Sequence, residues 1–435
     1  MVSSTGFIVV VAFVVRILFL FVFYHRYGET TVSDRVPLGV FGETGEVARA
    51  IAEGRGFSSP LQGFQSGPTA WLTPIFPYLL AGVFKIYGTF SYSSGLVIRA
   101  IDLAFSAFTC WPICAIGTKA FGRVTGKAAA WIWVICPTAI YFPLLWVWDT
   151  ALAGLWMALL FAATLLLRGS DRIGWWAAYG ALWAVGALIS PSLLSVLPFL
   201  ALWALWPLRQ RLEHAARLAV VASLIFTAGI APWTIRNYVV FHKFIPLRSN
   251  FGLELWLGNN PSVPETWSPG LHPNENPVEG AKYVRMTEIP YMEEKQREAF
   301  AFLRSHPLDA AHFAFRRFAQ NWLGMWDSPY DIWSHAPLYA KLAIVWNCSF
   351  SLLSLVGVLF AYRAGKKEAV PFAMVMLIFP LIFYLTHTSL RYRFPLDPIM
   401  QVLAAYAVVY PFSKLVAHWQ GFPAARLEAP AHRTE

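Results

Sequence analysis

The sequence predicts an all-α polytopic membrane protein, and three observations lead to that prediction. Hydrophobic residues make up 57% of the 435 residues. Charged residues make up only 13%, whereas roughly 25% is usual in soluble domains. Apolar runs of about 17–25 residues, a length that crosses a bilayer, recur along most of the chain. In a membrane protein, basic residues orient the spans and contact anionic lipid, which accounts for the net charge of +10. The sequence contains no nucleic-acid motif.

About ten runs qualify as membrane spans by length and hydropathy. The first lacks a basic leading region and a small-residue cleavage site, so we interpret it as an uncleaved span rather than a signal peptide. Ser190-Pro191-Ser192 is a turn signal that divides one long apolar run into two spans. The four cysteines lie inside apolar runs, and we expect no disulfide. The predicted spans cover residues 6–24, 96–116, 127–145, 149–168, 174–190, 191–207, 217–235, 341–362, 369–386 and 396–413.

Short loops rich in Lys and Arg mark the cytoplasmic side of a membrane protein. Four predicted loops carry such residues, while the turns at 146–149 and 189–192 carry none. With both termini in the cytoplasm, every one of these loops falls on the expected side. Residues 1–420 then form a single transmembrane domain, and 421–435 form a short polar cytoplasmic tail. The basic loop residues are Lys119, Arg123 and Lys127, then Arg168 and Arg172, then Arg209, Arg211 and Arg217, and finally Arg363, Lys366 and Lys367.

Two long segments, about 25–95 and about 236–340, then face outward. Counting the short apolar stretch Pro74–Gly88 as a span would invert every later loop, so we expect a helix in the outer interface instead. In the second segment an apolar stripe at helical spacing follows Pro307, a residue suited to the first turn of a helix. We expect that helix to lie on the membrane surface. The stripe consists of Leu308, Ala311, Phe315, Phe318 and Trp322.

Ionisable residues gather at the outer ends of the predicted spans and in the two outer segments. A transporter would instead carry them near mid-membrane, often in two repeated halves. The distribution favours a reaction centre at the outer interface. A transporter or flippase of a lipid-linked glycan is the main alternative, and a non-catalytic assembly or sensor protein is another. The residues concerned are Glu43, Glu46, Arg99, Asp102, Asp149, Arg236, Arg391 and Arg393.

Arg391 and Arg393 lie in a short outer loop, where the orientation rule disfavours arginine. One explanation is structural, namely a salt bridge to Asp397 or contacts with anionic lipid headgroups. The other is functional, because the guanidinium fork matches phosphate oxygens and keeps its charge at any relevant pH. Both explanations stay open on the sequence alone.

The first outer segment is dense in Gly, Pro and aromatic residues, which indicates a structured loop rather than a linker. Its two carboxylates, Glu43 and Glu46, precede Gly54-Arg55-Gly56-Phe57. Either carboxylate can cap the helix expected over Val47–Glu53, or it can act in catalysis. No Asp-x-Asp pair and no cluster of metal-ligand residues occurs, so the sequence predicts neither a metal nor a cofactor.

These motifs, taken in order, resemble the GT-C superfamily of membrane glycosyltransferases. The resemblance points to the branch with protein O-mannosyltransferases, aminoarabinose transferases of lipid A and rhizobial core-galacturonosyl transferases. That branch has an acidic residue after the first span, a G-x-G-F stretch, and a Pro-rich helix ending in Phe-x-x-x-Gly. Glu43, Gly54–Phe57 and Pro74–Gly88 match that order. Later matches are Arg99, Asp149, Pro232–Tyr238, Asn250–Asn260 and Arg391–Pro398.

The resemblance implies an inverting transferase that moves a hexosyl or pentosyl group from a polyprenyl-phosphate donor to an envelope lipid, glycan or protein. It implies an active site on the outer face of a bacterial inner membrane. Because the lipid phosphate leaves readily, one carboxylate suffices to deprotonate the acceptor, and fixed cations stabilise the departing phosphate. We predict Glu43 as the base, with Glu46 and Asp149 as alternatives. The predicted phosphate ligands are Arg391, Arg393, Arg236, Arg248 and Arg99.

Overall fold

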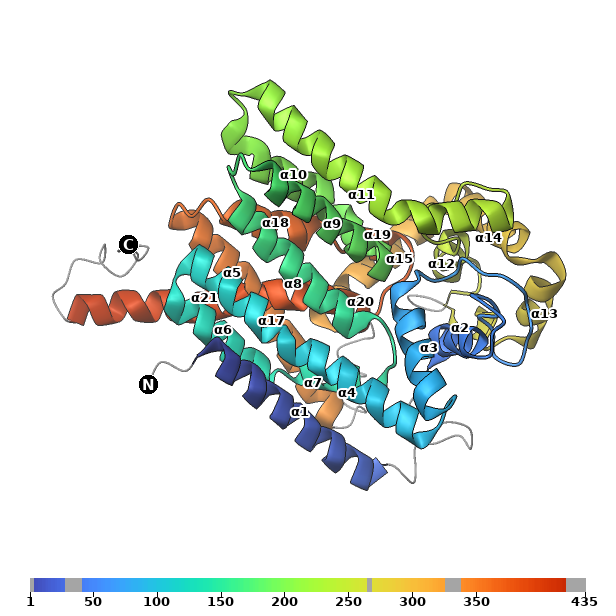
Figure 1. The fold of residues 1–435 in the computed structure, drawn as a ribbon. Helices are drawn as coiled ribbons and strands as arrows, with labels where there is room; N and C mark the ends of the chain where they lie inside the picture. The colour runs from blue at the N-terminus through green and yellow to red at the C-terminus, as the bar shows by residue number, and fades with distance from the viewer. Residues whose placement is uncertain (1–3, 28–40, 264–267, 325–337, 420–435) are drawn as a thin grey trace.

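The computed structural model describes residues 4–27, 41–263, 268–324 and 338–419. Over these ranges the chain forms α-helices and short 3-10 helices and contains no strand, which confirms the all-α class. Long helices form a tilted bundle, and shorter helices gather at one end of it (Figure 1).

The bundle is built from the segments predicted as spans. Six segments of the described chain are long and apolar enough to cross a membrane, by length and composition. They are α1 (Thr5–Tyr27), α4 with α5 (Tyr92–Phe108, Cys110–Phe121), α8 (Thr150–Leu167), α10 with its flanking 3-10 turns (Pro191–Leu208), α11 (Leu212–Phe241) and α17 (Leu338–Arg363). The pair α6 (Arg123–Ile135) and α7 (Pro137–Leu145), bent by 43°, makes a seventh.

The predicted count of ten spans is not confirmed, although every predicted span is helical. Two of the remaining segments, α9 (Ile173–Ile189) and the pair α18–α19 (Ala369–Ile378, Leu381–Leu385), are apolar but lie at the lower limit of the length that crosses a bilayer. The last helix, α21 (Asp397–Trp419), begins at a buried carboxylate and contains Pro411. The predicted count rested on apolar runs in the sequence, and these do not show where the helices bend and end.

Arg16 explains how the bundle accommodates the bend between α6 and α7. Pro137 has no N–H, so the carbonyl of Trp133 lacks its usual helical partner. The buried Arg16 of α1 donates to the carbonyl oxygens of Trp133 (2.9 Å) and Val134 (3.3 Å). Its Nε also donates to Ser106 Oγ at 3.0 Å. An arginine inside the first span thus satisfies backbone groups that no water can reach.

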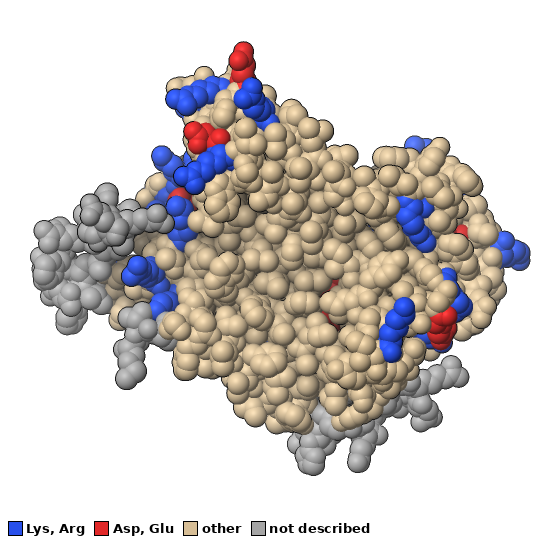
Figure 2. All heavy atoms as spheres, in the orientation of Figure 1, with Lys and Arg blue, Asp and Glu red and all other residues tan. Residues whose placement is uncertain are grey.

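The outer surface of the bundle is apolar. On α11, for example, Val220 and Leu224 are 55% and 63% exposed. Figure 2 shows a broad band nearly without charge between the charged ends of the molecule, as expected of a surface that faces lipid. The α5–α6 and α10–α11 connections lie at the end where α1 begins and α21 ends (Figure 1), which agrees with the predicted grouping of the basic loops.

Six shorter helices cover the opposite end of the bundle, and we call them the helical cap. The predicted interfacial helix is α3, which packs on α2 and α4 through Phe76, Leu80 and Phe84. The predicted amphipathic helix is α15, which exposes Leu308 and Phe315 and begins with Pro307. The cap consists of α2 (Gly42–Ala52), α3 (Ile75–Tyr87), α12 (Phe251–Gly258), α13 (Pro277–Met286), α14 (Glu288–Ser305) and α15 (Pro307–Leu323).

Glu288 joins the two outer segments inside this cap. Its buried carboxylate accepts hydrogen bonds from the backbone N–H of Ala70 (2.7 Å), the hydroxyls of Ser249 (2.6 Å) and Tyr283 (2.7 Å), and the hydroxyl of Thr69. Burial raises the pKa of Glu288, although all four donors favour its ionised form. Nothing in the local sequence marks Glu288, so it could not be predicted as a buried link between the two segments.

Candidate active site

The two competing carboxylates of α2 have different surroundings. Glu43 is buried at the start of α2, and its Oε1 accepts a hydrogen bond from Asn274 Nδ2 (2.7 Å) and lies 3.4 Å from His272 Nε2. Its Oε2 accepts no hydrogen bond from the described residues. Glu46, one turn later, forms an ion pair with Arg49, and burial raises its pKa. One carboxylate oxygen of Glu43 can therefore still accept a proton from another group, whereas the carboxylate of Glu46 is paired with Arg49.

Arg391 lies among aromatic rings near Glu43. In α20 (Leu390–Arg393), its guanidinium carbon lies 4.0 Å from the ring centre of Trp148 and 4.9 Å from that of Tyr392. Nη2 donates to the Tyr392 hydroxyl at 3.1 Å. Burial opposes its charge, but Tyr392, Glu43 and Glu254 together raise the pKa of Arg391. A cation so placed has few internal acceptors and faces nearby carboxylates.

Asp149 and Arg248 belong to the same region. Asp149 precedes α8, and its pKa is raised by burial, while the positive charges of Arg248 and Arg391 partly offset this effect. Arg248 donates from Nε to the carbonyl oxygen of Trp71 at 2.8 Å. Two arginines thus lie close enough to Asp149 for their charges to act on it. The structure brings together four of the predicted residues, namely Glu43, Asp149, Arg248 and Arg391.

Contacts of Trp71 and Trp148 connect the members of this group to one another. Trp71, which accepts from Arg248, lies 5.7 Å from the ring of His272, and His272 contacts Glu43. On the other side, a Cβ at Gly42 would lie 2.9 Å from the Trp148 ring, so the backbone beside Glu43 packs directly on the indole that stacks on Arg391. We call Glu43, Asp149, Arg248, His272 and Arg391 the Glu43–Arg391 cluster.

Arg393 and Arg99 have structural contacts instead. Arg393 is 1% exposed and donates to Asp397 (3.0 Å), the carbonyl of Asn321 (2.9 Å), Ser351 (3.3 Å) and Asn347 (2.8 Å). Arg99, also 1% exposed, donates to the carbonyls of Pro143 and Leu145 at the end of α7. Their guanidinium groups are occupied by the protein, so a phosphate would have to displace internal partners.

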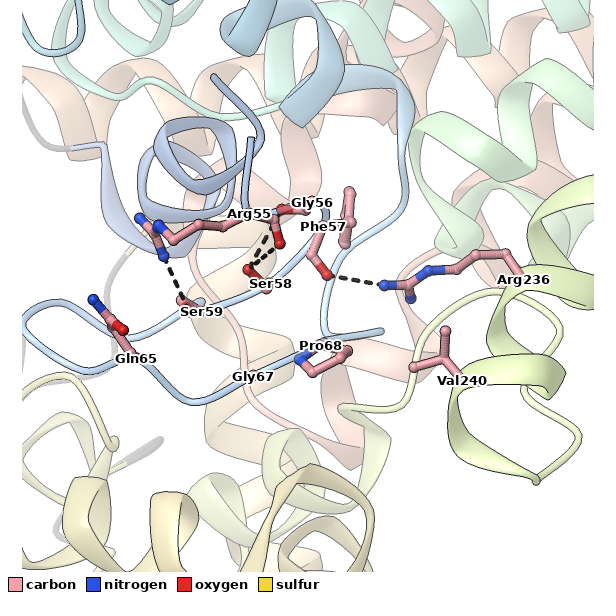
Figure 3. A pocket seen from close by; sticks show the side chains of 10 residues that line it. All are labelled: Arg55, Gly56, Phe57, Ser58, Ser59, Gln65, Gly67, Pro68, Arg236 and Val240. Carbon is pink, nitrogen blue, oxygen red and sulfur yellow. Dashed lines mark hydrogen bonds between the residues drawn. The ribbon is translucent and has the colours of Figure 1, made fainter. Parts of the chain in front are cut away.

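Arg236 lies at an open cavity of about 520 Å³ that Figure 3 shows between the loop around residues 55–68 and the end of α11. It donates to the carbonyls of Phe57 (2.9 Å) and Thr69 (2.6 Å), and so ties this loop to α11. On the other side of the cavity, Arg55 donates to Glu53 and Ser59. The polar groups of the cavity mostly bind one another, and no residue of the Glu43–Arg391 cluster lines it.

Several members of the site had no signal in the sequence that we recognised. His272, Asn274 and Glu254 lie in the second outer segment, and only folding brings His272 and Asn274 near Glu43 and Glu254 near Arg391. Trp148 did offer a signal, since an aromatic residue beside Asp149 fits a site that holds a cation. Its buried indole N–H has no acceptor among the described residues. In those residues no group of three or more His, Cys, Asp or Glu could hold a metal ion.

Known proteins resemble this chain in structure rather than in sequence. No family model and no curated protein matches it. The oligosaccharyltransferase of Archaeoglobus fulgidus in complex with zinc and sulfate matches with a TM-score of 0.54 and 15% identity, over 94% of this chain and 50% of that one. AglB of the same organism, with an inhibitory peptide and a dolichol-phosphate, matches with a TM-score of 0.55 and 16% identity, over 99% and 52%.

ArnT from Cupriavidus metallidurans bound to undecaprenyl phosphate also matches, over 96% of this chain and 80% of that one at 15% identity. Its TM-score of 0.34 is too low to support a shared fold by itself. The chain spans about half the length of the archaeal oligosaccharyltransferases. The resemblance stated from the motifs is confirmed at the level of the fold alone: this helical membrane protein shares the fold of the archaeal oligosaccharyltransferases over about half of their length.

Proposed function

We propose that this protein is an inverting glycosyltransferase that moves a sugar from a polyprenyl-phosphate donor to an envelope acceptor at the outer face of a bacterial inner membrane. One observation carries the proposal. Glu43 presents a carboxylate that is held through one oxygen and lies close enough to the Arg391 guanidinium for their charges to interact, and the charges of Arg248 and Arg391 both act on the nearby Asp149. A base next to fixed cations is what transfer from a lipid phosphate requires.

The proposed reaction is a single displacement. The acceptor oxygen attacks the anomeric carbon while Glu43 takes the acceptor proton through Oε2. The bond between that carbon and the phosphate oxygen breaks, and the electron pair leaves with the polyprenyl phosphate. Arg391 and Arg248 stabilise the charge that grows on the phosphate. Attack from the side opposite the leaving group inverts the anomeric centre, and no second carboxylate is needed to protonate the phosphate.

Three of the predicted phosphate ligands take other roles in this proposal. Arg393 and Arg99 fix the ends of helices, and Arg236 holds the loop of residues 55–68 against α11. Asp149 balances the charge of Arg248 and Arg391, while Glu46 pairs with Arg49. A further donor beside Arg391 is the indole N–H of Trp148, which can bind a phosphate or sugar oxygen.

The structural neighbours support a lipid-phosphate donor in general terms. AglB was solved with a dolichol-phosphate and an inhibitory peptide, and an oligosaccharyltransferase of the same organism was solved tethered to an acceptor peptide. The shared fold makes a lipid-linked donor a reasonable expectation here. The alternative of a transporter or flippase would require ionisable groups that lead through the bundle. Arg16 and Arg393, two of the buried arginines, are instead bound to backbone carbonyls and side chains.

The test is sugar transfer in liposomes from a panel of radiolabelled polyprenyl-phosphate sugars to envelope lipid, glycan and peptide acceptors. We expect Glu43→Gln to lower the transfer rate by about 10² to 10⁴, the usual contribution of a positioned base. Glu46→Gln is the matched control and should retain most activity. Equal transfer by wild type and Glu43→Gln would refute the role of Glu43. Transbilayer movement of the lipid without any transfer would favour the flippase.

A further inference from the structure

A chain of hydrogen bonds runs from Arg391 to a carboxylate in the helical cap. Arg391 Nη2 lies 3.1 Å from the Tyr392 hydroxyl, and that hydroxyl lies 3.0 Å from His387 Nε2. His387 Nδ1 lies 3.3 Å from Glu254 Oε2 and 3.4 Å from the Glu254 carbonyl oxygen. Glu254 belongs to α12, so the chain links the loop before α21 with the second outer segment.

The chemistry of the partners fixes the direction of each hydrogen bond. A guanidinium can only donate, so Arg391 donates to the Tyr392 oxygen. Both Glu254 oxygens can only accept when the carboxylate is ionised, so His387 Nδ1 carries the proton and donates to Glu254. A neutral imidazole protonated on Nδ1 has a lone pair on Nε2, which accepts the Tyr392 hydroxyl proton. Each hydrogen bond of the chain thus has one defined direction.

The far end of the chain is also anchored. Asn250 donates from Nδ2 to Glu254 Oε1 at 2.5 Å, which leaves Oε2 for His387. His387 is only 5% exposed, and the Tyr392 ring stacks on Phe383 at 5.1 Å between ring centres. The chain of hydrogen bonds is therefore fixed by Asn250 at Glu254 and by Phe383 at Tyr392. Arg391 has no other hydrogen-bond partner among the described residues.

We propose that Glu254, His387 and Tyr392 are positioning residues that orient the Arg391 guanidinium for a lipid phosphate, and that they do so only while His387 is neutral. This inference rests on the proposed function, because it takes Arg391 as the phosphate ligand. If His387 gains a proton on Nε2, it becomes a donor and the Tyr392 hydroxyl can no longer donate to it. The Tyr392 proton then turns toward Arg391, and the guanidinium loses its acceptor.

The charges around His387 favour the neutral ring at neutral pH. Burial lowers the pKa of His387 below its usual value near 6.5, and Arg391 and Arg317 lower it further, while Glu254 opposes them. Among the described residues, the groups that face His387 include Glu254 from α12, Arg317 from α15, and Arg391 and Tyr392 from α20. Since the folded-state pKa is depressed, the oriented form is present above it and is lost as the pH falls through it.

The experiment measures binding of undecaprenyl phosphate to the purified full-length protein in detergent between about pH 5 and about pH 8. We expect Tyr392→Phe to bind about tenfold more weakly at the upper pH, the usual cost of losing a hydrogen bond to a charged group. Tyr362→Phe, at an exposed site on α17, is the matched control and should bind like wild type. His387→Gln, which cannot titrate but can accept the Tyr392 proton, should bind nearly as well as wild type at the upper pH.

The comparison of pH profiles decides the outcome. A phosphate monoester itself gains a proton near pH 6, so wild type and His387→Gln share that contribution. We expect wild type to lose several-fold more affinity toward acid pH than His387→Gln. Identical profiles, or unchanged affinity in Tyr392→Phe, would overturn the inference while leaving the proposed function intact. Absence of lipid phosphate binding by wild type at every pH would refute the proposed function, and the inference with it.

Discussion

Arg391 and Arg393 are two residues apart, and their surroundings are opposite. Arg393 is almost fully buried and donates to four oxygen acceptors, including Asp397 at 3.0 Å. Arg391 donates to Tyr392 alone among the described residues and otherwise lies against the rings of Trp148 and Trp146. Satisfied donors hold the fold together, whereas donors that face aromatic rings stay available for a ligand, which under the proposed function is a phosphate. Sequence position alone could not separate these two arginines.

The same contrast separates two buried glutamates. Glu288 accepts four hydrogen bonds and connects the outer segments. Glu43 accepts a hydrogen bond from Asn274 through one oxygen, and its other oxygen can still accept a proton. We therefore expect variants at the saturated sites, Arg393 and Glu288, to lose stability first. Variants in the Glu43–Arg391 cluster should lose ligand binding or transfer first.

The largest effect on stability is expected from Arg393→Ala. Removing one partner of a buried ion pair leaves the other charge uncompensated, which costs about 3–5 kcal/mol. Here Asp397 would be left inside the bundle together with the acceptors on Asn321 and Asn347. The measurement is the midpoint of thermal unfolding in detergent. Arg363→Ala, at the exposed end of α17, is the control and should unfold like wild type.

If Arg393→Ala were as stable as wild type and lost only lipid phosphate binding, the contrast between the two arginines would be wrong. Arg393 would then be a ligand, as the sequence first suggested. A loss of stability in Arg393→Ala, beside a stable Arg391→Ala that fails to bind, would support the contrast from both sides.

A smaller loss of stability is expected from Glu288→Gln. The amide keeps the shape but offers one acceptor oxygen in place of two, so at least one buried donor loses its partner, at a cost of about 1–3 kcal/mol. Thermal unfolding should shift downward, while transfer per folded molecule should stay close to wild type. Normal stability combined with lost transfer would instead place Glu288 in the reaction.

The sequence predicted the fold class and the helical segments, because both depend on local features. The site stays a prediction. Apolar runs marked the bundle. Glu43, Asp149 and Arg391 were predicted because ionisable residues gather at the outer span ends and in the outer segments, and Arg248 was predicted from the family resemblance. The partners His272 and Asn274 could not be predicted, since they approach Glu43 only through the packing of α2 against the second outer segment. The points at which the helices end, which leave the count of ten spans unconfirmed, likewise depend on tertiary contacts.

The smallest effect is expected from Trp148→Leu, which tests whether aromatic rings keep Arg391 available. Loss of a cation–π contact costs about 0.5–2 kcal/mol, so undecaprenyl phosphate should bind roughly 2- to 30-fold more weakly. Stability should change little, because Trp148 is only partly buried and its N–H has no internal acceptor. Trp111→Leu, at an exposed position on α5, is the matched control. Tighter binding in Trp148→Leu would show that the indole competes with the phosphate for Arg391, so that stacking would restrain the arginine rather than present it.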